Sequence, residues 1–281
     1  MSETVKLVFI GGGNMSQAIL GGLIAKGQAL VDCWVIDPFE PARAKMAELG
    51  VPVSAEVDDR VMEALLVATA IVLAVKPQVM KAALAPLSGK LTRQLVISIA
   101  AGVSIESMAK WLGTAQQPYT QIVRTMPNTP ALIQAGITGL YAPPNVAAID
   151  RTIAENLLRA VGKTVWFESE DMLNAVTAVS GSGPAYVFYF IEALEAAAIE
   201  LGFPVDAARL FAQETFLGGA KLAAQSSDSP AQLRAKVTSK HGTTERAIEY
   251  FDAVALKSIF IDGVKAACAR SRELGEAFKN E

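Results

Sequence analysis

The chain has 281 residues, of which 52% are hydrophobic and 19% are charged, and its formal net charge is −3. This length is sufficient for two hydrophobic cores. The chain has no lysine-rich or arginine-rich block, which argues against a nucleic acid or an anionic membrane as its partner. Its longest apolar stretches, such as LVISIAAGV at 95–103, are much shorter than the roughly 20 residues that span a bilayer.

The N-terminus and the cysteines bear on where the protein works. MSETVK leads into an apolar run that is too short for a secretory signal. The only cysteines, Cys33 and Cys268, lie in different halves of the chain, which suits a reducing cytosol better than a disulfide framework. Together with a single histidine they offer no cluster of metal ligands. We therefore expect a cytoplasmic protein without a metal site.

Short apolar runs alternate with helical segments over the first 167 residues. The runs are rich in β-branched residues and end at Gly, Pro or Asn, as buried strands do. They occupy 5–10, 33–37, 70–75, 94–100 and 120–125, and helical spacing is found at 14–26, 41–49 and 104–112. This alternation predicts the α/β class, with a doubly wound parallel sheet covered by helices on both faces. Two further predicted strands, 137–142 and 164–168, extend one edge of the sheet.

The pattern changes after about residue 168. No strand is expected there, and Ala, Leu and Phe recur at helical spacing in 171–201, 206–225 and 254–274. We therefore predict two domains, residues 1–167 and an all-helical domain of residues 168–281. Segment 185–199 is apolar almost all round, and such a helix must be buried on every side. This predicts a homodimer or a larger homo-oligomer, a decamer included, through the C-terminal helices; packing against the first domain alone is the alternative.

A glycine cluster follows the first predicted strand and opens the first helix. Dinucleotide binding needs glycine at a tight turn and again where the backbone meets the pyrophosphate, and Gly11 and Gly13 supply both. The helix start offers free N–H groups and a positive dipole end. Ser16 takes the third position of the fingerprint, where a small residue still permits close packing of helix and strand. A simple tight turn is the alternative to a Rossmann-type site formed by Ile10, Gly11, Gly12, Gly13, Asn14 and Met15.

Asp37 ends the second predicted strand. An acid at this position can accept hydrogen bonds from both ribose hydroxyls, which favours NADH. Arg43 could instead meet the 2′-phosphate of NADPH. We expect NADPH or NADH as cofactor, with a weak preference for NADH. Asp37, which precedes Pro38, could also simply initiate a turn.

Five segments, in their order and spacing, resemble pyrroline-5-carboxylate reductase over nearly the whole chain. They are FIGGGNM at 9–15, AVKP at 74–77, RTMPNTP at 124–130, SGSGPAY at 180–186 and LRAKVTSKHGTTERAIEYF at 233–251. The last is the most diagnostic because it is close to the family signature VTSPGGTT. It departs from the family at Lys240 and His241, where Pro or Lys and then Gly or Asn are usual. The resemblance implies an oxidoreductase that reduces L-1-pyrroline-5-carboxylate to L-proline with NADPH or NADH, the last step of proline biosynthesis.

Further cofactor contacts are expected at the carboxyl edge of the sheet, where open α/β sheets bind their ligands. The resemblance implies that the AVKP segment contacts the nicotinamide ribose. The alanines after the 94–100 strand are small enough for a nicotinamide ring to lie against the backbone. The predicted contacts are Ala74, Val75, Lys76, Pro77, Ala100, Ala101 and Asn128. A solvated Lys76 and a local Asn turn at Asn128 are the alternatives.

Substrate contacts are expected around two helix starts. The glycines of SGSGPAY allow close approach, and Pro184 fits a first helical turn; a purely structural kink is the alternative. The helix that opens at residue 242 offers N–H groups and threonine hydroxyls to a carboxylate, although an ordinary N-cap would look the same. By resemblance, its two threonines hold the substrate carboxylate and ring nitrogen. The predicted substrate-binding residues are Glu170, Ser180, Gly181, Ser182, Gly183, Gly242, Thr243 and Thr244. Glu170 is included by resemblance, and an exposed acid at a helix start is the alternative.

Thr244 is the predicted catalytic residue, bonded to the ring nitrogen and positioning it more than donating a proton. His241 is the alternative acid because imidazole titrates near neutral pH, but a histidine on the loop surface is favoured. Two other functions are kept open: a 3-hydroxyacid or related imine dehydrogenase, and a non-catalytic nucleotide sensor. The VTSKHGTT segment argues against the first. The second predicts tight cofactor binding without consumption of NADH.

Overall fold

The structure is a computed structural model, and it describes residues 6–28, 30, 32–114 and 116–279. Its contacts define two compact units. We call Met1–Ser182 with Ala267–Glu281 the sheet unit, and Gly183–Ala266 the helical unit. The predicted division after residue 167 therefore differs from the division by contacts. The reason is that helix α7 (Met172–Val176) packs on the sheet, and the end of the last helix, α12 (Leu256–Lys279), belongs to the sheet unit.

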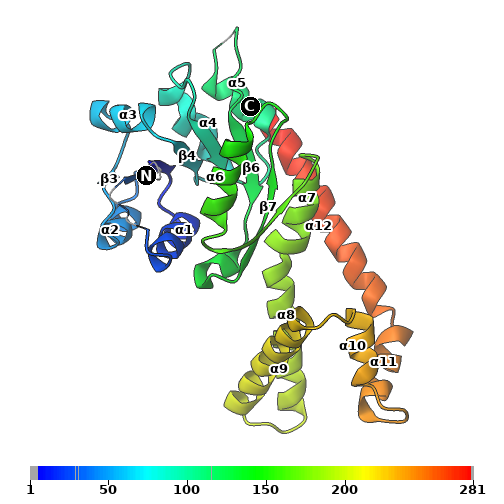
Figure 1. Cartoon of the computed structure of the whole chain (residues 1–281). Coiled ribbons are helices and arrows are strands. Elements are labelled where there is room, and N and C mark those ends of the chain that lie inside the picture. The colour runs from blue at the N-terminus through cyan, green and yellow to red at the C-terminus, as the bar shows by residue number, and fades with distance from the viewer. Residues whose placement is uncertain (1–5, 29, 31, 115, 280–281) are drawn as a thin grey trace. The chain divides into compact units, whose positions relative to one another are not determined.

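An eight-stranded sheet forms the centre of the sheet unit (Figure 1). Its order is β3-β2-β1-β4-β5-β6-β7-β8, and the pairs are parallel except β6 with β7. The strands are β1 (Leu7–Ile10), β2 (Cys33–Ile36), β3 (Val53–Ser54), β4 (Ala70–Leu73), β5 (Leu95–Ser98), β6 (Ile122–Met126), β7 (Gly136–Tyr141) and β8 (Gly162–Trp166). The predicted doubly wound sheet and its two-strand extension at one edge are confirmed. Val5, in the predicted first strand, lies outside the described residues.

Helices cover both faces of this sheet (Figure 1). Besides α7 they are α1 (Asn14–Ala25), α2 (Glu40–Glu48), α3 (Asp59–Leu66), α4 (Pro77–Leu84), α5 (Ile105–Leu112) and α6 (Ala148–Leu158). Local chemistry sets several of their starts: Asp58 and Ser104 accept backbone N–H bonds as N-caps, and Pro77 opens α4. Neighbouring side chains of β1 point to opposite faces, so Phe9 and Ile10 belong to two separate buried clusters.

Shorter helical turns connect these elements. Two 3₁₀ turns, η1 (Ala85–Leu87) and η2 (Thr129–Ile133), follow α4 and β6. A π-helical turn, η3 (Thr177–Gly181), continues α7. The sequence predicts a helix start at SGSGPAY, within the helical pattern of 171–201. In the structure α7, η3 and α8 (Gly183–Glu200) follow one another, with a change of winding at this motif.

The helical unit contains α8, α9 (Val205–Gln225), α10 (Pro230–Lys236), α11 (Thr243–Ala253) and the beginning of α12. Helices α8 and α9 pack against each other, joined by an ion pair of 3.1 Å between Arg209 Nη2 and Glu195 Oε1. Phe260 of α12 contacts Tyr186 and Phe190 of α8. The described residues after Trp166 form helices and turns only. None of the described helices combines the length and the apolar character needed to cross a membrane.

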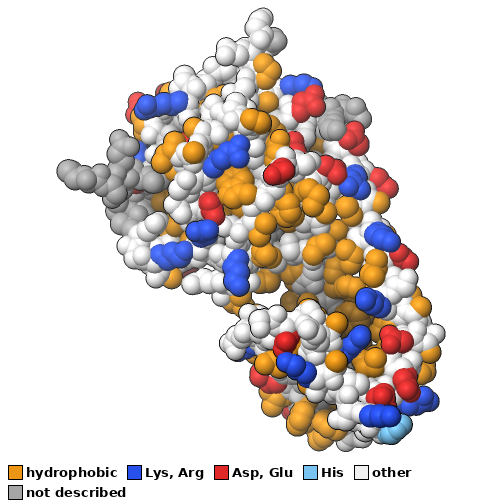
Figure 2. Space-filling model, turned by 45° about the vertical axis from the view of Figure 1, so that its right-hand side comes forward, with side chains coloured by type: hydrophobic (Ala, Val, Ile, Leu, Met, Phe, Trp, Pro, Cys, Tyr) orange, Lys and Arg blue, Asp and Glu red, His pale blue; other side chains and the backbone are white. Residues whose placement is uncertain are grey.

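The helical unit leaves most of its apolar side chains at its surface. Among the described residues of α8 none is buried, and in α9 only Ala208 and Ala212 are. Figure 2 shows hydrophobic side chains on the surface of this unit, interspersed with charged ones. The large exposed ones include Phe188 (66%), Tyr189 (68%), Leu210 (57%) and Phe211 (60%). The helical unit by itself therefore does not bury the apolar faces of α8 and α9.

Candidate active site

The β1–α1 turn has the geometry of a phosphate-binding loop. Gly11 has a φ of +105°, and a Cβ there would lie 2.6 Å from the carbonyl oxygen of Ala74, so only glycine fits. Gly13 is the N-cap of α1 and makes no side-chain cap, which leaves the first-turn N–H groups of the helix for a ligand. Ser16, fully buried, donates its hydroxyl to the carbonyl of Gly11 at 2.7 Å. The residue that departs from the fingerprint thus stabilises the turn.

Asp37 lies at the end of β2, beside this turn. Its carboxylate accepts the N–H of Gly12 at 2.7 Å and that of Phe39 at 2.8 Å. Arg43 donates Nη1 to the carbonyls of Asp37 and Pro38, at 2.8 and 2.7 Å. Both side chains therefore shape the local backbone, and the bond from the Phe39 N–H is the turn that the sequence allowed as an alternative role of Asp37. The weak preference for NADH stays a prediction.

The AVKP segment lies beside the glycine turn at the carboxyl edge of the sheet. The N–H of Ala74 donates to the carbonyl of Ile10 at 2.8 Å, which joins the ends of β4 and β1. Lys76 is the exposed N-cap of α4 and Pro77 its first residue. Ala100, which is buried, and Ala101 follow β5, the strand next to β4. The predicted cofactor residues of β1, β4 and β5 thus meet at one edge.

A cavity of about 270 Å³ opens at this edge within the sheet unit. Pro77, Ala101 and Ser182, from three separate predicted segments, all line it, as does Thr177 of η3. The sequence reading missed a fourth wall, which the end of α12 supplies. Its residues are Ala267, Arg270, Ser271, Leu274 and Phe278. No signal in the sequence shows that the last turns of a long helix belong to the sheet unit.

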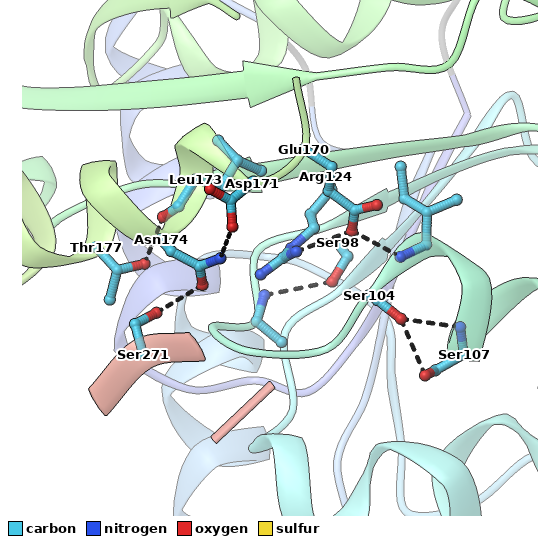
Figure 3. Close-up of polar contacts among 12 residues, drawn as sticks. Ser98, Ser104, Ser107, Arg124, Glu170, Asp171, Leu173, Asn174, Thr177 and Ser271 are labelled. Atoms are coloured by element: carbon cyan, nitrogen blue, oxygen red, sulfur yellow. Dashed lines mark hydrogen bonds and ion pairs between the residues drawn. The ribbon is translucent and has the colours of Figure 1, made fainter. Parts of the chain in front are cut away.

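Glu170, predicted to contact substrate, takes part in a polar network beside this cavity (Figure 3). Its Oε1 accepts Nη1 of Arg124 at 2.8 Å and the backbone N–H of Ile105 at 2.9 Å. The Arg124 side chain is only 7% exposed, so this ion pair is largely desolvated. The pair ties α5, β6 and the start of α7 together. Charged and polar residues of this network also line a second cavity of about 260 Å³.

Asp171 and Asn174 attach the end of α12 to the same region. Arg272 forms a bidentate ion pair with Asp171, its shorter contact 2.8 Å. Ser271 donates to Asn174 Oδ1 at 2.8 Å (Figure 3). Hydrogen bonds from Arg272 and then Asn174 lower the pKa of the Asp171 carboxyl below its usual value. Phe278 is buried, and a Cβ on Gly102 would lie 3.3 Å from its ring. These contacts fix the α12 wall of the cavity.

The π-helical turn η3 carries the first predicted substrate segment. The N–H of Ser182 donates to the carbonyl of Thr177 at 2.8 Å, the bond that defines the wider winding. Gly181 is in close contact with β6, since a Cβ on it would lie 2.6 Å from Cε of Met126. Asn128 Nδ2 donates to the carbonyl of Ser180 at 3.1 Å. Gly183 begins α8 and stands at the start of the helical unit.

The second predicted substrate segment lies in the helical unit, at the start of α11. Gly242 is its N-cap without a side-chain cap, followed by the exposed Thr243 and Thr244. His241, with a φ of +59°, is in the left-handed region, which explains why the family usually has Gly or Asn there. Its side chain is 84% exposed. This agrees with the surface position that the sequence favours for His241.

Thiol and metal chemistry find little support in the described residues. Burial, with a smaller contribution from Asp32, raises the pKa of the Cys33 thiol to about 11, so it stays protonated at neutral pH. No group of three or more His, Cys, Asp or Glu side chains among the described residues is placed to hold a metal ion.

The parallel sheet, the glycine turn and the cavity at the carboxyl edge define a dinucleotide-binding oxidoreductase. Two family models match: NADP oxidoreductase coenzyme F420-dependent over residues 6–102, and pyrroline-5-carboxylate reductase dimerisation over residues 170–274. The chain belongs to the pyrroline-5-carboxylate reductase family. It is 42% identical over 276 residues to the pyrroline-5-carboxylate reductase of Pseudomonas aeruginosa, covering 98% of each chain. It is 36% identical to that of Escherichia coli over 274 residues, covering 97% of this chain and 99% of the relative.

Solved structures of the same family resemble the whole chain. A pyrroline-5-carboxylate reductase of Coxiella burnetii matches with a TM-score of 0.87 and 40% identity, over 97% of this chain and 99% of that one. A Plasmodium falciparum pyrroline carboxylate reductase with NADP bound matches with a TM-score of 0.82 and 25% identity, over the same shares. The predicted fold class and family are confirmed.

Proposed function

We propose that this chain reduces L-1-pyrroline-5-carboxylate to L-proline with NADPH or NADH, the last step of proline biosynthesis. The observation that carries the proposal is the 270 Å³ cavity at the carboxyl edge of the sheet. Segments that resemble the family's cofactor and substrate motifs meet there, through Pro77, Ala101 and Ser182. The identity to curated members of the family over nearly the full chain supports the same reaction.

The glycine turn would hold the cofactor's pyrophosphate. Free N–H groups at the start of α1 point where an anion is stabilised by the helix dipole. The close approach of Gly11 to Ala74 brings the two strand ends together, so that the cofactor can pass from the turn to the AVKP segment. Met15 and Asn14, in the first turn of α1, lie beside it. These residues fit a dinucleotide.

A bound reduced nicotinamide supplies the hydride. The small side chains of Ala100 and Ala101 leave room for a flat ring against the backbone. Leu274 and Phe278 give the cavity an apolar wall that excludes water from the reacting atoms. Thr177 and Ser182 line the cavity with polar groups that can orient the ring's carboxamide or the substrate.

The start of α11 would hold the substrate. Its first-turn N–H groups and the hydroxyls of Thr243 and Thr244 suit a carboxylate, and no side chain caps this helix. The imine carbon accepts hydride readily once the ring nitrogen is protonated. We assign to Thr244 the placement of that nitrogen.

Assembly and location complete the proposal. The match to the family's dimerisation model covers the helices whose apolar faces the helical unit by itself leaves exposed. We propose a homodimer or larger homo-oligomer formed through the C-terminal helices. The two free cysteines, Cys33 and Cys268, support a reducing compartment, and we propose the cytoplasm.

The test measures the absorbance of reduced nicotinamide when purified protein is mixed with pyrroline-5-carboxylate and either cofactor. We expect proline to form in the amount of cofactor oxidised. Thr244→Ala is expected to lower kcat/KM for the imine by about 100-fold, since it removes a positioning contact, with little change in cofactor affinity. Thr152→Ala, an exposed threonine of α6, is the matched control. Cofactor binding without oxidation by the wild-type protein would instead indicate a nucleotide sensor.

The His241→Gly variant distinguishes the two interpretations of the single histidine, a surface residue or the proton donor. Glycine adopts the left-handed conformation at this position without strain. We expect turnover within about twofold of wild type and a slightly higher Tm. A large loss of kcat with unchanged substrate binding would assign the proton transfer to His241 and overturn the role given to Thr244.

A further inference from the structure

We propose that Asn128 is a positioning residue whose side-chain amide replaces the backbone N–H that Pro184 lacks, and so holds η3 in the shape in which Thr177 and Ser182 line the cavity. The structural part of this inference stands on contacts within the sheet unit. Its effect on turnover rests on the proposed function.

The sequence itself creates the need for such a residue. In an α-helix each carbonyl accepts the N–H four residues later. For Ser180 that donor would come from residue 184, which is proline and has no N–H. The SGSGP motif therefore leaves one carbonyl inside a helical path without its usual partner, and at the half-buried Ser180 an unpaired carbonyl is costly.

Asn128 supplies the missing donor from another part of the chain. Its Nδ2 donates to the Ser180 carbonyl at 3.1 Å, and its Oδ1 accepts the N–H of Ile137 at 2.9 Å. The second bond determines which way the amide faces. Because the Ile137 N–H can only donate, the oxygen must face it, and the NH₂ group must face Ser180. Asn128 is only 9% exposed, so water does not readily replace it.

The same loop holds η3 at a second point. Met126, two residues before Asn128, packs on Gly181, where a Cβ would lie 2.6 Å from its Cε. The two contacts hold consecutive residues of η3 against the end of β6. The bond from the Ser182 N–H to the Thr177 carbonyl then closes the turn at 2.8 Å. Thr177 and Ser182, its two ends, both line the cavity. π-helical turns are frequent at functional sites because they re-aim side chains in this way.

This role differs from the predicted cofactor contact of Asn128. Each polar atom of its amide is bonded to the protein, and these two bonds fix the orientation of the side chain. We infer that Asn128 acts through the Ser180 carbonyl and the turn.

A double-mutant cycle with Pro184→Ala tests the inference through turnover. Asn128→Ala is expected to lower kcat about tenfold with the cofactor KM nearly unchanged, because η3 shifts while the glycine turn does not. In the Pro184→Ala background, residue 184 regains an N–H that can bond Ser180. The Asn128→Ala penalty should then shrink to about twofold. Additive effects of the two substitutions would overturn the proposal.

Two further variants separate the bond to Ser180 from general damage. Asn128→Asp keeps an acceptor for Ile137 but turns a carboxylate oxygen toward the Ser180 carbonyl, so we expect it to be as impaired as Asn128→Ala. Its activity should recover as the pH falls, since a protonated carboxyl can donate. Asn145→Ala removes a comparable bond, from Asn145 Nδ2 to the Thr120 carbonyl at 2.9 Å, outside the residues that line the cavity, and should leave turnover unchanged. A fully active Asn128→Asp at neutral pH would contradict the proposal.

Hydrogen–deuterium exchange tests the structural step without any substrate. The Ser182 amide is expected to exchange about tenfold faster in Asn128→Ala than in wild type, and to regain protection in the double variant with Pro184→Ala. Equal exchange in all variants would overturn the proposal whatever the reaction is. If the wild-type protein failed to reduce pyrroline-5-carboxylate, the proposed function would fall, while this measurement would still decide the role of Asn128.

Discussion

The two units of the chain differ in how much of their apolar surface they bury. The sheet unit contains two large clusters of buried side chains, one on each face of the sheet. In the helical unit, Ala208 and Ala212 are the only buried residues of α8 and α9. Burial of apolar area is the main favourable contribution to folding. The comparison teaches that one chain suffices to specify the sheet unit, whereas the helical unit needs a further surface to complete it.

The difference also separates the two halves of the proposed reaction. The glycine turn, the AVKP segment and the α12 wall are held by contacts inside the sheet unit, so the proposed cofactor side of the site is preformed. Thr243 and Thr244 lie in the unit that depends on additional burial. Assembly is therefore expected to influence substrate binding more than cofactor binding.

Gly22→Ala should produce the largest effect, because it disturbs the close packing that specifies the sheet unit. A Cβ at Gly22 would lie 2.4 Å from the carbonyl oxygen of Ala160, a backbone atom that cannot move aside easily. We expect the free energy of unfolding to fall by about 3 kcal/mol, measured by urea denaturation. Gly21→Ala, on the same helix with no atom within 4 Å, is the matched control and should stabilise by about 1 kcal/mol. Similar effects of both would mean that α1 is not closely packed.

Phe188→Asp tests whether the helical unit needs a further surface to cover its apolar side chains. Phe188 is 66% exposed on α8, and covering it in an assembly contributes about 2 kcal/mol per subunit. We expect the charged variant to shift the protein toward monomer in light scattering and to weaken imine binding more than cofactor binding. Val67→Asp, at a side chain 60% exposed after α3 in the sheet unit, should leave the assembly intact. An unchanged assembly in Phe188→Asp would place the interface on another face.

The smallest effect is expected at the exposed ion pair that attaches α12. The pKa of Asp171 is lowered in the folded protein, so its stabilising contribution is present above the unfolded pKa and is lost as the pH falls through the folded value. The Tm of wild type should therefore decrease more steeply than that of Arg272→Met between pH 5 and acid pH, by a small amount because both side chains are over half exposed. Parallel pH profiles would show that the pair contributes nothing to attaching α12.

Much of the fold could be predicted because hydrophobic periodicity and local residue chemistry determine most of its strands and helices. Strands β1, β2, β4 and β5 are continuous apolar runs, and each follows the predicted range to within a few residues. Strand β3 could not be predicted, since two residues have no period. The helix start at the SGSGP motif could be predicted from its Gly and Pro residues, but the π-helical winding of η3 could not, because apolar spacing does not distinguish it from an ordinary helix.

The role of a site residue could be predicted where it follows from the local sequence. It could not be predicted where it depends on a hydrogen-bond or ion-pair partner far along the chain. Residue 11 must be glycine because its φ is positive, and the glycine cluster in the sequence indicates this constraint. Glu170 pairs with Arg124, and Asn128 with Ser180, across long stretches of sequence. The sequence is equally compatible with ligand contacts by Glu170 and Asn128. It therefore does not distinguish a ligand-binding role of these side chains from a structural one.

The sequence by itself determined the alternation of strands and helices, the glycine turn and the family, because these depend on spacing and residue type along the chain. Tertiary structure alone decided that the end of α12 walls the cavity, that Asp37 and Asn128 support backbone, and that α8 and α9 expose apolar faces. The physical reason is that these properties depend on distances between atoms far apart in the chain. Hydrogen bonds and burial act over a few ångströms in space, whatever the separation in sequence.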